Sequence, residues 1–298
     1  MNNVQRLNTL LILLMSIFPL VAQANSTPQQ PPQSASEPTL ADRGSAYYRF
    51  ERLHVDSADG KRRYRLDLAI PRRAAPAAGY PVVYLLDGNN VLAELRDDWL
   101  GELDAGNPPV LVMVGYDIDG RYDMDLRTRD YTGASSADFL KSLITKIKPL
   151  IEKQQPIDRT RQMLWGHSFG GLFVLYALFE DPQAFQTWFA ASPSLWYQPQ
   201  TYAKGMGFAG IAKDSKRHVM IMRGSKEGRP PIKSFDGGSL ERRKAMAAVP
   251  LDANQKVAEH LATLPGVTAH YQEFEGLAHG EMFNAALYPA LRMAAGLK

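Results

Sequence analysis

The sequence of 298 residues contains no cysteine. This absence excludes disulfide bonds, metal sites built on thiolates and a cysteine nucleophile. An excess of charge of one sign is also missing, because 34 lysines and arginines stand against 31 aspartates and glutamates, for a formal net charge of +3. So small a net charge argues against a general nucleic-acid-binding protein. No internal repeat and no second domain boundary is visible, which leaves one large domain.

A short apolar run near the N-terminus has the features of a secretion signal. Arg6 precedes it, Leu10–Val21 is almost wholly apolar, and residues 22–24 match the A-x-A cleavage rule. The run is too short to span a bilayer comfortably. We therefore predict a signal peptide over residues 1–24 that is cleaved rather than kept as an anchor, and no membrane span in the mature protein.

The segment after this signal differs in composition from the rest of the chain. Residues 25–40 are rich in proline, glutamine and serine and have almost no apolar content, which predicts a disordered tether. Residues 41–298 then form the folded domain, whose size is typical of one α/β domain. An exported protein without disulfides fits the bacterial periplasm better than a eukaryotic extracellular space.

Alternating and continuous apolar runs predict a mostly parallel sheet. The segment Tyr47–Ile70 holds two alternating runs around a turn, which is typical of an antiparallel hairpin. Pro81–Leu86 and Val110–Val114 are continuously apolar, as expected of strands buried on both faces. Helical periodicity over Ala137–Glu152, followed by further strand–helix alternation, predicts an eight-stranded sheet with helices on both faces.

Gly166 to Gly170 read G-H-S-F-G, a G-x-S-x-G motif centred on Ser168. An apolar run precedes the motif and a helical pattern follows it. A tight turn between a strand and a helix holds the serine hydroxyl at the end of the sheet, as in the α/β-hydrolase fold. We predict that fold, with Ser168 as nucleophile. The alternative is a glycine-rich strand-to-helix turn of another α/β protein.

A serine hydroxyl becomes a good nucleophile only when a base takes its proton. Of the six histidines, only His279 lies in a loop after the last predicted strand, where this chain order places the base. His167, beside the serine, is expected to point away from it. Glu227 follows the preceding predicted strand and is the candidate acid that orients the imidazole. Asp236, Glu241 and a Ser–His dyad oriented by a backbone carbonyl remain alternatives.

The developing oxyanion of an ester reaction needs at least two preorganised donors. The backbone N–H of Phe169, directly after the nucleophile, is the first candidate. The second is the N–H of Asn89, in the loop after the strand Pro81–Leu86, where Gly88 allows the chain to turn.

Several segments together resemble one known family. They read L-L-D-G-N-N from Leu85, G-Y-D-I-D-G-R-Y-D-M-D-L-R-T-R-D-Y-T from Gly115, G-H-S-F-G-G, S-P-S-L-W and H-G-E-M-F. In these the chain resembles the putative-esterase branch of the α/β-hydrolases, and most of all its periplasmic enterobactin-type siderophore esterases. The resemblance covers essentially the whole mature domain. Gly133 departs from it, since this group usually has proline after D-Y-T.

The resemblance implies a serine esterase that cuts the trilactone of a ferric catecholate siderophore such as enterobactin. Some members of the group are described as using a Ser–His dyad. No cofactor and no metal site of the enzyme itself are implied, because iron enters only as part of the substrate. The partner is therefore a small molecule.

Cationic and aromatic residues support an anionic aromatic substrate independently of the resemblance. Arginine binds anionic oxygens and stacks on flat rings. We expect Arg121, Arg127 and Arg129 to lie on a loop at the carboxyl end of the Val110 strand, where open α/β sheets bind ligands. With Tyr131 and Trp196 they form the predicted substrate-binding set.

The long segment Gly224–Ala248 is a candidate basic lid. Its cationic residues are Arg229, Lys233, Arg242 and Arg243.

Two other readings remain open. One is a different exported acyl esterase or acyltransferase of the same fold, similar to mycolyl transferases or S-formylglutathione hydrolases. The other is a siderophore-binding protein with a vestigial hydrolase site.

Overall fold

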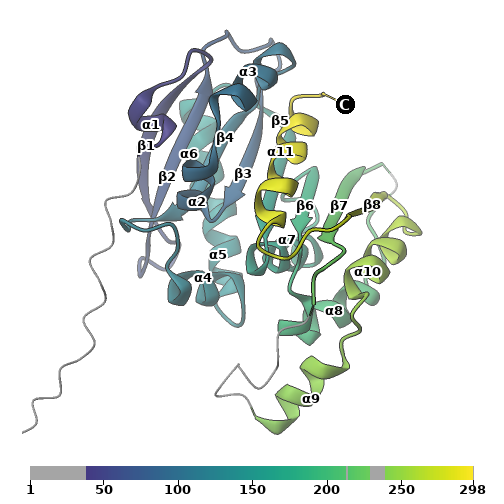
Figure 1. The fold of residues 1–298 in the computed structure, drawn as a ribbon. Coiled ribbons are helices and arrows are strands. Elements are labelled where there is room, and N and C mark those ends of the chain that lie inside the picture. Colours follow the sequence, from purple (N-terminus) through teal and green to yellow (C-terminus); the bar gives the residue numbers. More distant parts are fainter. Residues whose placement is uncertain (1–37, 213, 229–238, 298) are drawn as a thin grey trace, which may run out of the picture. The chain divides into compact units, whose positions relative to one another are not determined.

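A twisted eight-stranded sheet runs through the centre of the molecule in the computed structural model, which describes residues 38–212, 214–228 and 239–297 (Figure 1). The strands are β1 (Tyr48–Asp56), β2 (Arg63–Pro71), β3 (Tyr80–Leu86), β4 (Val110–Tyr116), β5 (Ile157–His167), β6 (Thr187–Ala191), β7 (Arg217–Gly224) and β8 (Val267–Phe274). The predicted signal peptide and the predicted tether up to residue 37 lie outside the described residues and stay predictions, as does the domain boundary.

The strand order is β1-β2-β4-β3-β5-β6-β7-β8. The β1–β2 and β2–β4 pairs are antiparallel, and every later pair is parallel. The predicted N-terminal hairpin and the mostly parallel sheet are thus confirmed. Because β5, β6, β7 and β8 are parallel neighbours, the loops that follow them meet at one edge of the sheet.

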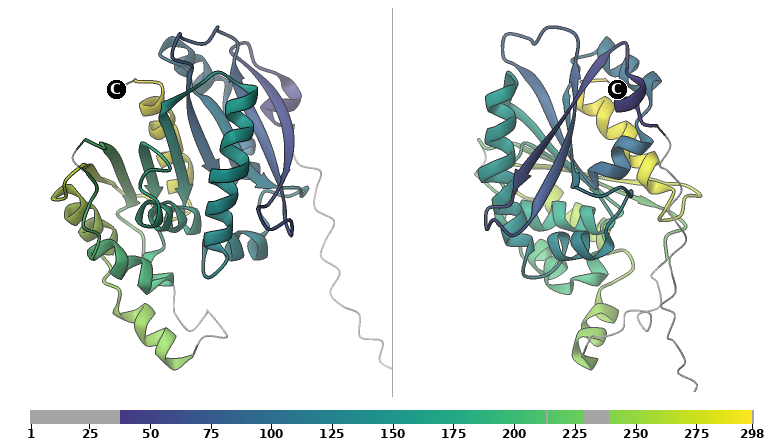
Figure 2. Two further views of the ribbon diagram at one scale, coloured as in Figure 1. Left: turned by 180° about the vertical axis from the view of Figure 1, so that it is seen from behind. Right: turned by 90° about the vertical axis from the view of Figure 1, so that its left-hand side faces the viewer.

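Helices cover both faces of the sheet, and each covered face has its own hydrophobic core (Figure 2). One face packs against α1 (Leu40–Arg43), α2 (Gly88–Glu94), α3 (Asp97–Ala105) and α11 (Met282–Ala294). The other packs against α4 (Met124–Tyr131), α5 (Ser136–Ser142), α6 (Lys148–Gln154), α7 (Phe169–Glu180), α8 (Pro199–Met206) and α10 (Ala253–Ala262). The alternation of side chains along β3 explains how one fully buried strand serves both cores.

One helix stands apart from these layers. Helix α9 (Leu240–Ala248) contacts α8 and the short 3-10 turn Leu195–Tyr197, and it projects away from the sheet (Figure 1). None of the helices in the described part of the chain is long and apolar enough to span a membrane.

The segment that carries Arg127 and Arg129 is the helix α4 rather than the expected loop, whereas Arg121 lies in the loop before it, as predicted. Asp123 caps α4, since its side chain accepts a hydrogen bond from the Leu126 N–H at 2.8 Å. A cap of this kind stabilises a helix that has little apolar periodicity of its own. Residues two positions apart on a helix do not face the same way. The helix therefore separates Arg127, which is buried, from Arg129, which is exposed.

Helical structure covers the predicted range Ala137–Glu152, but it is not a regular α-helix throughout. Leu143–Ile147 forms a π-helical turn between α5 and α6. Pro149 lies just after this turn and has no N–H to donate to the carbonyls before it, so the regular hydrogen-bond pattern is interrupted there.

Candidate active site

Ser168 occupies a strained turn between β5 and α7. Its φ is 61° and its ψ is −116°, a conformation that residues other than glycine rarely adopt. The Ser168 N–H donates to the carbonyl of Ala191 on β6 at 2.9 Å, which fixes the turn against the neighbouring strand. The hydroxyl is thereby held at the edge of the sheet, ahead of α7.

Two glycines around Ser168 allow the backbones to approach this closely. A Cβ at Gly166 would lie 2.5 Å from the carbonyl oxygen of Gly170, and a Cβ at Gly171 would lie 2.6 Å from the carbonyl oxygen of Ala191. In both cases the obstacle is backbone, which cannot move aside without opening the turn. Gly166, the first glycine of the motif, and Gly171, directly after the motif, are therefore steric requirements of the serine's conformation.

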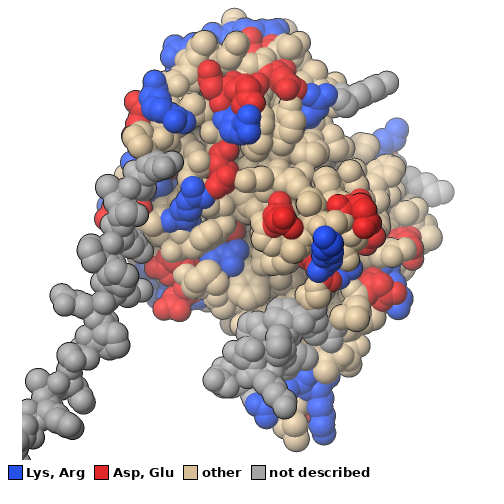
Figure 3. All heavy atoms as spheres, in the orientation of Figure 1, with Lys and Arg blue, Asp and Glu red and all other residues tan. Residues whose placement is uncertain are grey.

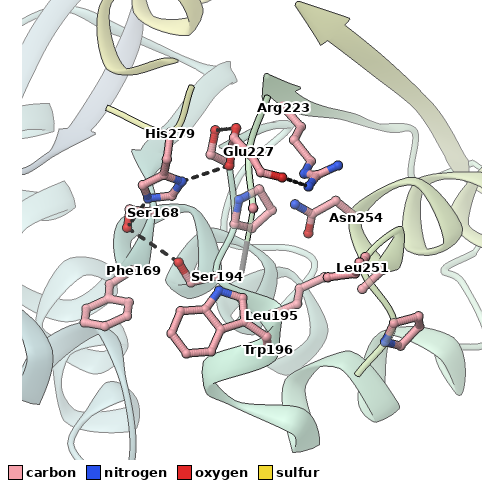
Figure 4. Close-up of a pocket in the computed structure, with 15 residues that line it drawn as sticks. Ser168, Phe169, Ser194, Leu195, Trp196, Arg223, Glu227, Leu251, Asn254 and His279 are labelled. Carbon is pink, nitrogen blue, oxygen red and sulfur yellow. Dashed lines mark hydrogen bonds and ion pairs between the residues drawn. The ribbon is translucent and has the colours of Figure 1, made fainter. Parts of the chain in front are cut away.

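His279 lies between Ser168 and Glu227 (Figure 4). Its Nε2 is 2.9 Å from Ser168 Oγ, and its Nδ1 is 2.8 Å from Glu227 Oε2. A carboxylate can only accept, so Nδ1 carries the proton and Nε2 is free to accept from the serine hydroxyl. The three side chains come from the loops after β5, β7 and β8, in the order Ser, Glu, His along the chain.

Glu227 is buried and fully hydrogen-bonded. Its other oxygen, Oε1, accepts from Ser192 Oγ at 2.6 Å and from the Gly224 N–H at 2.7 Å. Burial alone would raise the pKa of this carboxyl, but the hydrogen bonds from His279, Ser192 and Gly224 outweigh it and leave the pKa below its usual range. Glu227 is therefore an ionised acceptor for the imidazole at neutral pH.

The structure thus places a carboxylate where the dyad alternative expected a backbone carbonyl. Of the other candidate acids, Asp236 lies outside the described residues, and Glu241 lies exposed on α9.

The loops that carry Glu227 and His279 are joined by two hydrogen bonds, one between main-chain groups and one to a serine hydroxyl. The Lys226 N–H donates to the Leu277 carbonyl at 3.0 Å, and the Gly276 N–H donates to Ser225 Oγ at 2.8 Å. These contacts fix the distance between the two loops, and with it the distance between carboxylate and imidazole.

The His167 side chain packs against His279 and hydrogen-bonds its main chain, a role that the sequence did not indicate. Its Nε2 lies 2.9 Å from the carbonyl oxygen of His279, and the two rings are 4.8 Å apart. Burial, together with the neighbouring His279, lowers the pKa of His167 to about 3, so the ring is neutral and Nε2–H donates to the carbonyl. The only sequence signal was its position beside Ser168, which suggested a side chain directed away from the site.

The two predicted oxyanion donors lie at the starts of two helices. Phe169 is the first residue of α7 and Asn89 is the second residue of α2. N–H groups in a first turn have no partner within their own helix, so both can serve a ligand. The Asn89 side chain is used elsewhere. Its Nδ2 donates to the carbonyls of Tyr116 and Gly120 at 3.1 Å, and its Oδ1 accepts from the Tyr116 N–H.

Ser168, His279 and Glu227 open into a cavity of about 260 Å³. Its wall combines apolar and polar side chains, and it includes Trp196, as predicted for a substrate-binding residue. Among the lysines and arginines that the structure describes, only Arg223, near the end of β7, lines this cavity. It was not among the residues predicted from the sequence. Arg223 Nη2 also donates to the main-chain carbonyl of Glu227 at 2.5 Å. The remaining lining residues are Phe169, Ser192, Pro193, Ser194, Leu195, Gly228, Pro250, Leu251, Ala253 and Asn254.

Four residues of the predicted substrate-binding set lie elsewhere, which corrects the prediction. Tyr131 is fully buried, and its hydroxyl oxygen accepts from the Asp87 N–H. Arg127 is buried in an ion pair with Asp87. Arg121 pairs with Glu94 on the surface, and Arg129 is exposed on α4. None of these four lines the cavity.

On the face shown in Figure 3, basic and acidic side chains are mixed. Of the predicted lid cations, Arg229 and Lys233 lie outside the described residues. Arg242 on α9 places its guanidinium 5.1 Å from the centre of the Tyr197 ring.

Within the described residues no cluster of three or more histidine, cysteine, aspartate or glutamate side chains could hold a metal ion. The expectation that the enzyme needs no cofactor stays a prediction.

Comparison with known proteins agrees with this geometry. A family model described as "Putative esterase" matches residues 57–294. The chain belongs to this esterase family. Apo-salmochelin esterase of Escherichia coli O6:H1 (strain CFT073) is 35% identical over 272 residues, which cover 85% of this chain and 81% of that relative. Ferri-bacillibactin esterase BesA of Bacillus subtilis (strain 168) is 29% identical, over 80% of this chain and 87% of that relative.

A solved structure of the enterobactin and salmochelin hydrolase IroE has the same fold. It matches with a TM-score of 0.68 at 36% sequence identity, over 87% of this chain and 100% of that one. The α/β-hydrolase fold predicted from the sequence is thereby confirmed.

The neutral state of buried His167 predicts a pH dependence of stability. Between its pKa of about 3 in the folded protein and the ordinary value of 6.5, the unfolded chain binds a proton that the native protein does not. This residue therefore costs stability as pH falls below 6.5, on the order of 1 kcal/mol per pH unit. His167→Phe keeps a ring but cannot titrate. In urea unfolding at pH 7, 6 and 5, the free energy of unfolding of wild type should therefore fall relative to that of the variant as the pH is lowered. A difference that does not change with pH would contradict this assignment.

Proposed function

We propose that this protein is a serine esterase that hydrolyses the ester bonds of a catecholate siderophore. The observation that carries the proposal is the line of hydrogen bonds from Ser168 through His279 to Glu227, which opens into a cavity. A nucleophile, a base and an orienting acid in this geometry are the parts that acyl transfer requires. The named activities of the apo-salmochelin esterase and of IroE support the substrate class.

In the proposed mechanism, Ser168 Oγ attacks the ester carbonyl carbon while His279 Nε2 takes the hydroxyl proton. The N–H groups of Asn89 and Phe169 stabilise the negative charge that develops on the carbonyl oxygen. The ester C–O bond then breaks, and His279 gives its proton to the leaving alkoxide. Water, deprotonated by His279, releases the acyl group from Ser168 and completes hydrolysis.

Glu227 acts on His279 rather than on the substrate. It holds the imidazole so that Nε2 faces the serine, and its negative charge stabilises the imidazolium that forms in each half-reaction. Ser192 and Gly224 keep the carboxylate ionised and fixed in position for this role.

Hydrolysis of a trilactone would serve iron release. A closed trilactone presents three catechols as one preorganised ligand, and opening it removes that preorganisation. Iron is then held less tightly. In this proposal iron enters with the substrate, and the enzyme adds no cofactor of its own. The signal-like N-terminus supports the periplasm as the proposed location of the reaction.

Arg223 replaces Arg121, Arg127 and Arg129 as the proposed anion-binding group. It is half-buried in the cavity wall that Glu227 and Trp196 also line. Catecholate oxygens are anionic, and a charge-assisted hydrogen bond to a guanidinium contributes about 1.5–3 kcal/mol.

The first test of the proposal follows products directly. Wild type and Ser168→Ala are incubated with ferric and iron-free enterobactin, and the products are identified by mass spectrometry. We expect wild type to yield linear esters or their fragments, and the variant to yield none while still binding the siderophore, as followed by fluorescence quenching. Turnover that survives in Ser168→Ala would refute the nucleophile. Binding without turnover by wild type would favour the vestigial binding protein.

A second test concerns Arg223. We expect Arg223→Met to lower kcat/KM for the anionic siderophore about 10-fold or more beyond its effect on neutral p-nitrophenyl acetate. The neutral ester reports any loosening of Glu227, whose carbonyl Arg223 contacts. Arg129→Met, which removes an exposed arginine outside the cavity, is the matched control and should change neither rate. Equal losses on both substrates in Arg223→Met would contradict the anion-binding role.

A further inference from the structure

We propose that the buried ion pair between Arg127 and Asp87 positions the two backbone N–H groups that stabilise the oxyanion. This inference rests on the proposed esterase function. It assigns Arg127 a positioning role in place of the substrate contact that its sequence position suggested.

The pair is bidentate and almost fully buried. Arg127 Nε donates to Asp87 Oδ1 at 2.9 Å, and Nη2 donates to Oδ2 at 2.8 Å. The two side chains are only 6% and 2% exposed. Asp87 raises the pKa of Arg127 despite its burial, so the guanidinium is charged. Two parallel hydrogen bonds from a planar group fix orientation as well as distance.

On one side the pair holds the turn that carries Asn89. Asp87 has a left-handed backbone, with φ 54° and ψ 44°, and it directly precedes the first residue of α2. Such a conformation is unfavourable for aspartate unless its surroundings impose it. Two residues of α4 do so, because Arg127 binds the Asp87 carboxylate and the Tyr131 hydroxyl accepts from the Asp87 N–H at 3.0 Å.

On the other side the pair contacts the start of α7. The Arg127 guanidinium lies 5.4 Å from the centre of the Phe169 ring, a cation–π distance. Asp87 Oδ2 lies 3.6 Å from the place where Gly170 would carry a Cβ. The same two side chains therefore touch both turns that bear the proposed oxyanion donors, one at Asn89 and one at Phe169.

Stability alone is a poor reason for such a pair. Burying two charges costs desolvation that their attraction barely repays, and apolar residues of similar size often stabilise a core as well or better. Oxyanion donors, in contrast, must be held within a fraction of an ångström of their working position. The pair provides that constraint, because it allows one relative placement of the α2 and α7 starts.

The test removes both charges together, since a single substitution would leave one buried charge unpaired. The double variant Arg127→Gln/Asp87→Asn is compared with Arg292→Gln/Glu102→Gln, which removes a surface ion pair between α11 and α3. Both are assayed on p-nitrophenyl acetate well below their melting temperatures. Affinity for a boronic acid, which forms a tetrahedral adduct on the serine, reports the oxyanion contacts separately.

We expect the buried-pair variant to lose about 100-fold in kcat, with KM changed by less than about threefold, since one oxyanion donor contributes 10²–10³. Boronate affinity should fall by a similar factor, and the surface-pair variant should match wild type in all three quantities. Unchanged kcat and boronate affinity in a folded buried-pair variant would overturn the inference while leaving the esterase proposal intact. No ester hydrolysis by wild type would overturn both.

If the double variant does not fold, Phe169→Leu provides the second measurement. It keeps the backbone donor but removes the ring on which Arg127 lies, so kcat and boronate affinity should fall together. Because Phe169 also lines the cavity, KM is left out of this comparison. Wild-type values for both quantities would contradict the inference.

Discussion

The positive φ of Ser168 is the constraint on which the rest of the site depends. Gly166 and Gly171 allow the backbone segments around the turn to approach each other closely. The serine can therefore keep a backbone conformation that is unfavourable for residues other than glycine. The turn brings the hydroxyl to the edge of the sheet at which the loops after β7 and β8 begin. The hydrogen bonds to His279 and through it to Glu227 then follow from the parallel arrangement of the strands.

Several buried polar side chains near this turn have partners that give them a geometric role. Glu227 is held by Ser192 and Gly224, His167 contacts the carbonyl of His279, and Arg127 pairs with Asp87. Unpaired groups of this kind would destabilise the fold, so satisfying them fixes the side chains and loops that carry the chemistry. Positioning in this site is therefore distributed over several elements rather than confined to the three reacting side chains.

Chain order carried most of what the sequence could predict. A G-x-S-x-G turn between a strand and a helix, followed by an acid and then a histidine after later strands, suggested the three residues that the structure brings together. Local patterns also predicted the sheet, because buried strands such as β3 are continuously apolar. The resemblance to siderophore esterases added the substrate class.

The errors have physical causes that the sequence hides. The segment around Arg127 was expected to be a loop because it is polar, and only its cap at Asp123 and its packing on α7 make it a helix. Once it is helical, Arg127 and Tyr131 turn inward while Arg129 faces solvent. Arg223 gave no signal, since the end of a strand does not reveal which side chain reaches a cavity formed by distant loops.

In the proposed reaction, His279 takes the proton of Ser168. Covalent labelling by a fluorophosphonate tests this proton transfer, with rates, intact mass and peptide mapping compared between wild type and His279→Gln. We expect one adduct on Ser168 in wild type and labelling at least about 100-fold slower in the variant, because general-base assistance contributes 10²–10⁴. Labelling at another residue, or at an equal rate without the imidazole, would contradict it.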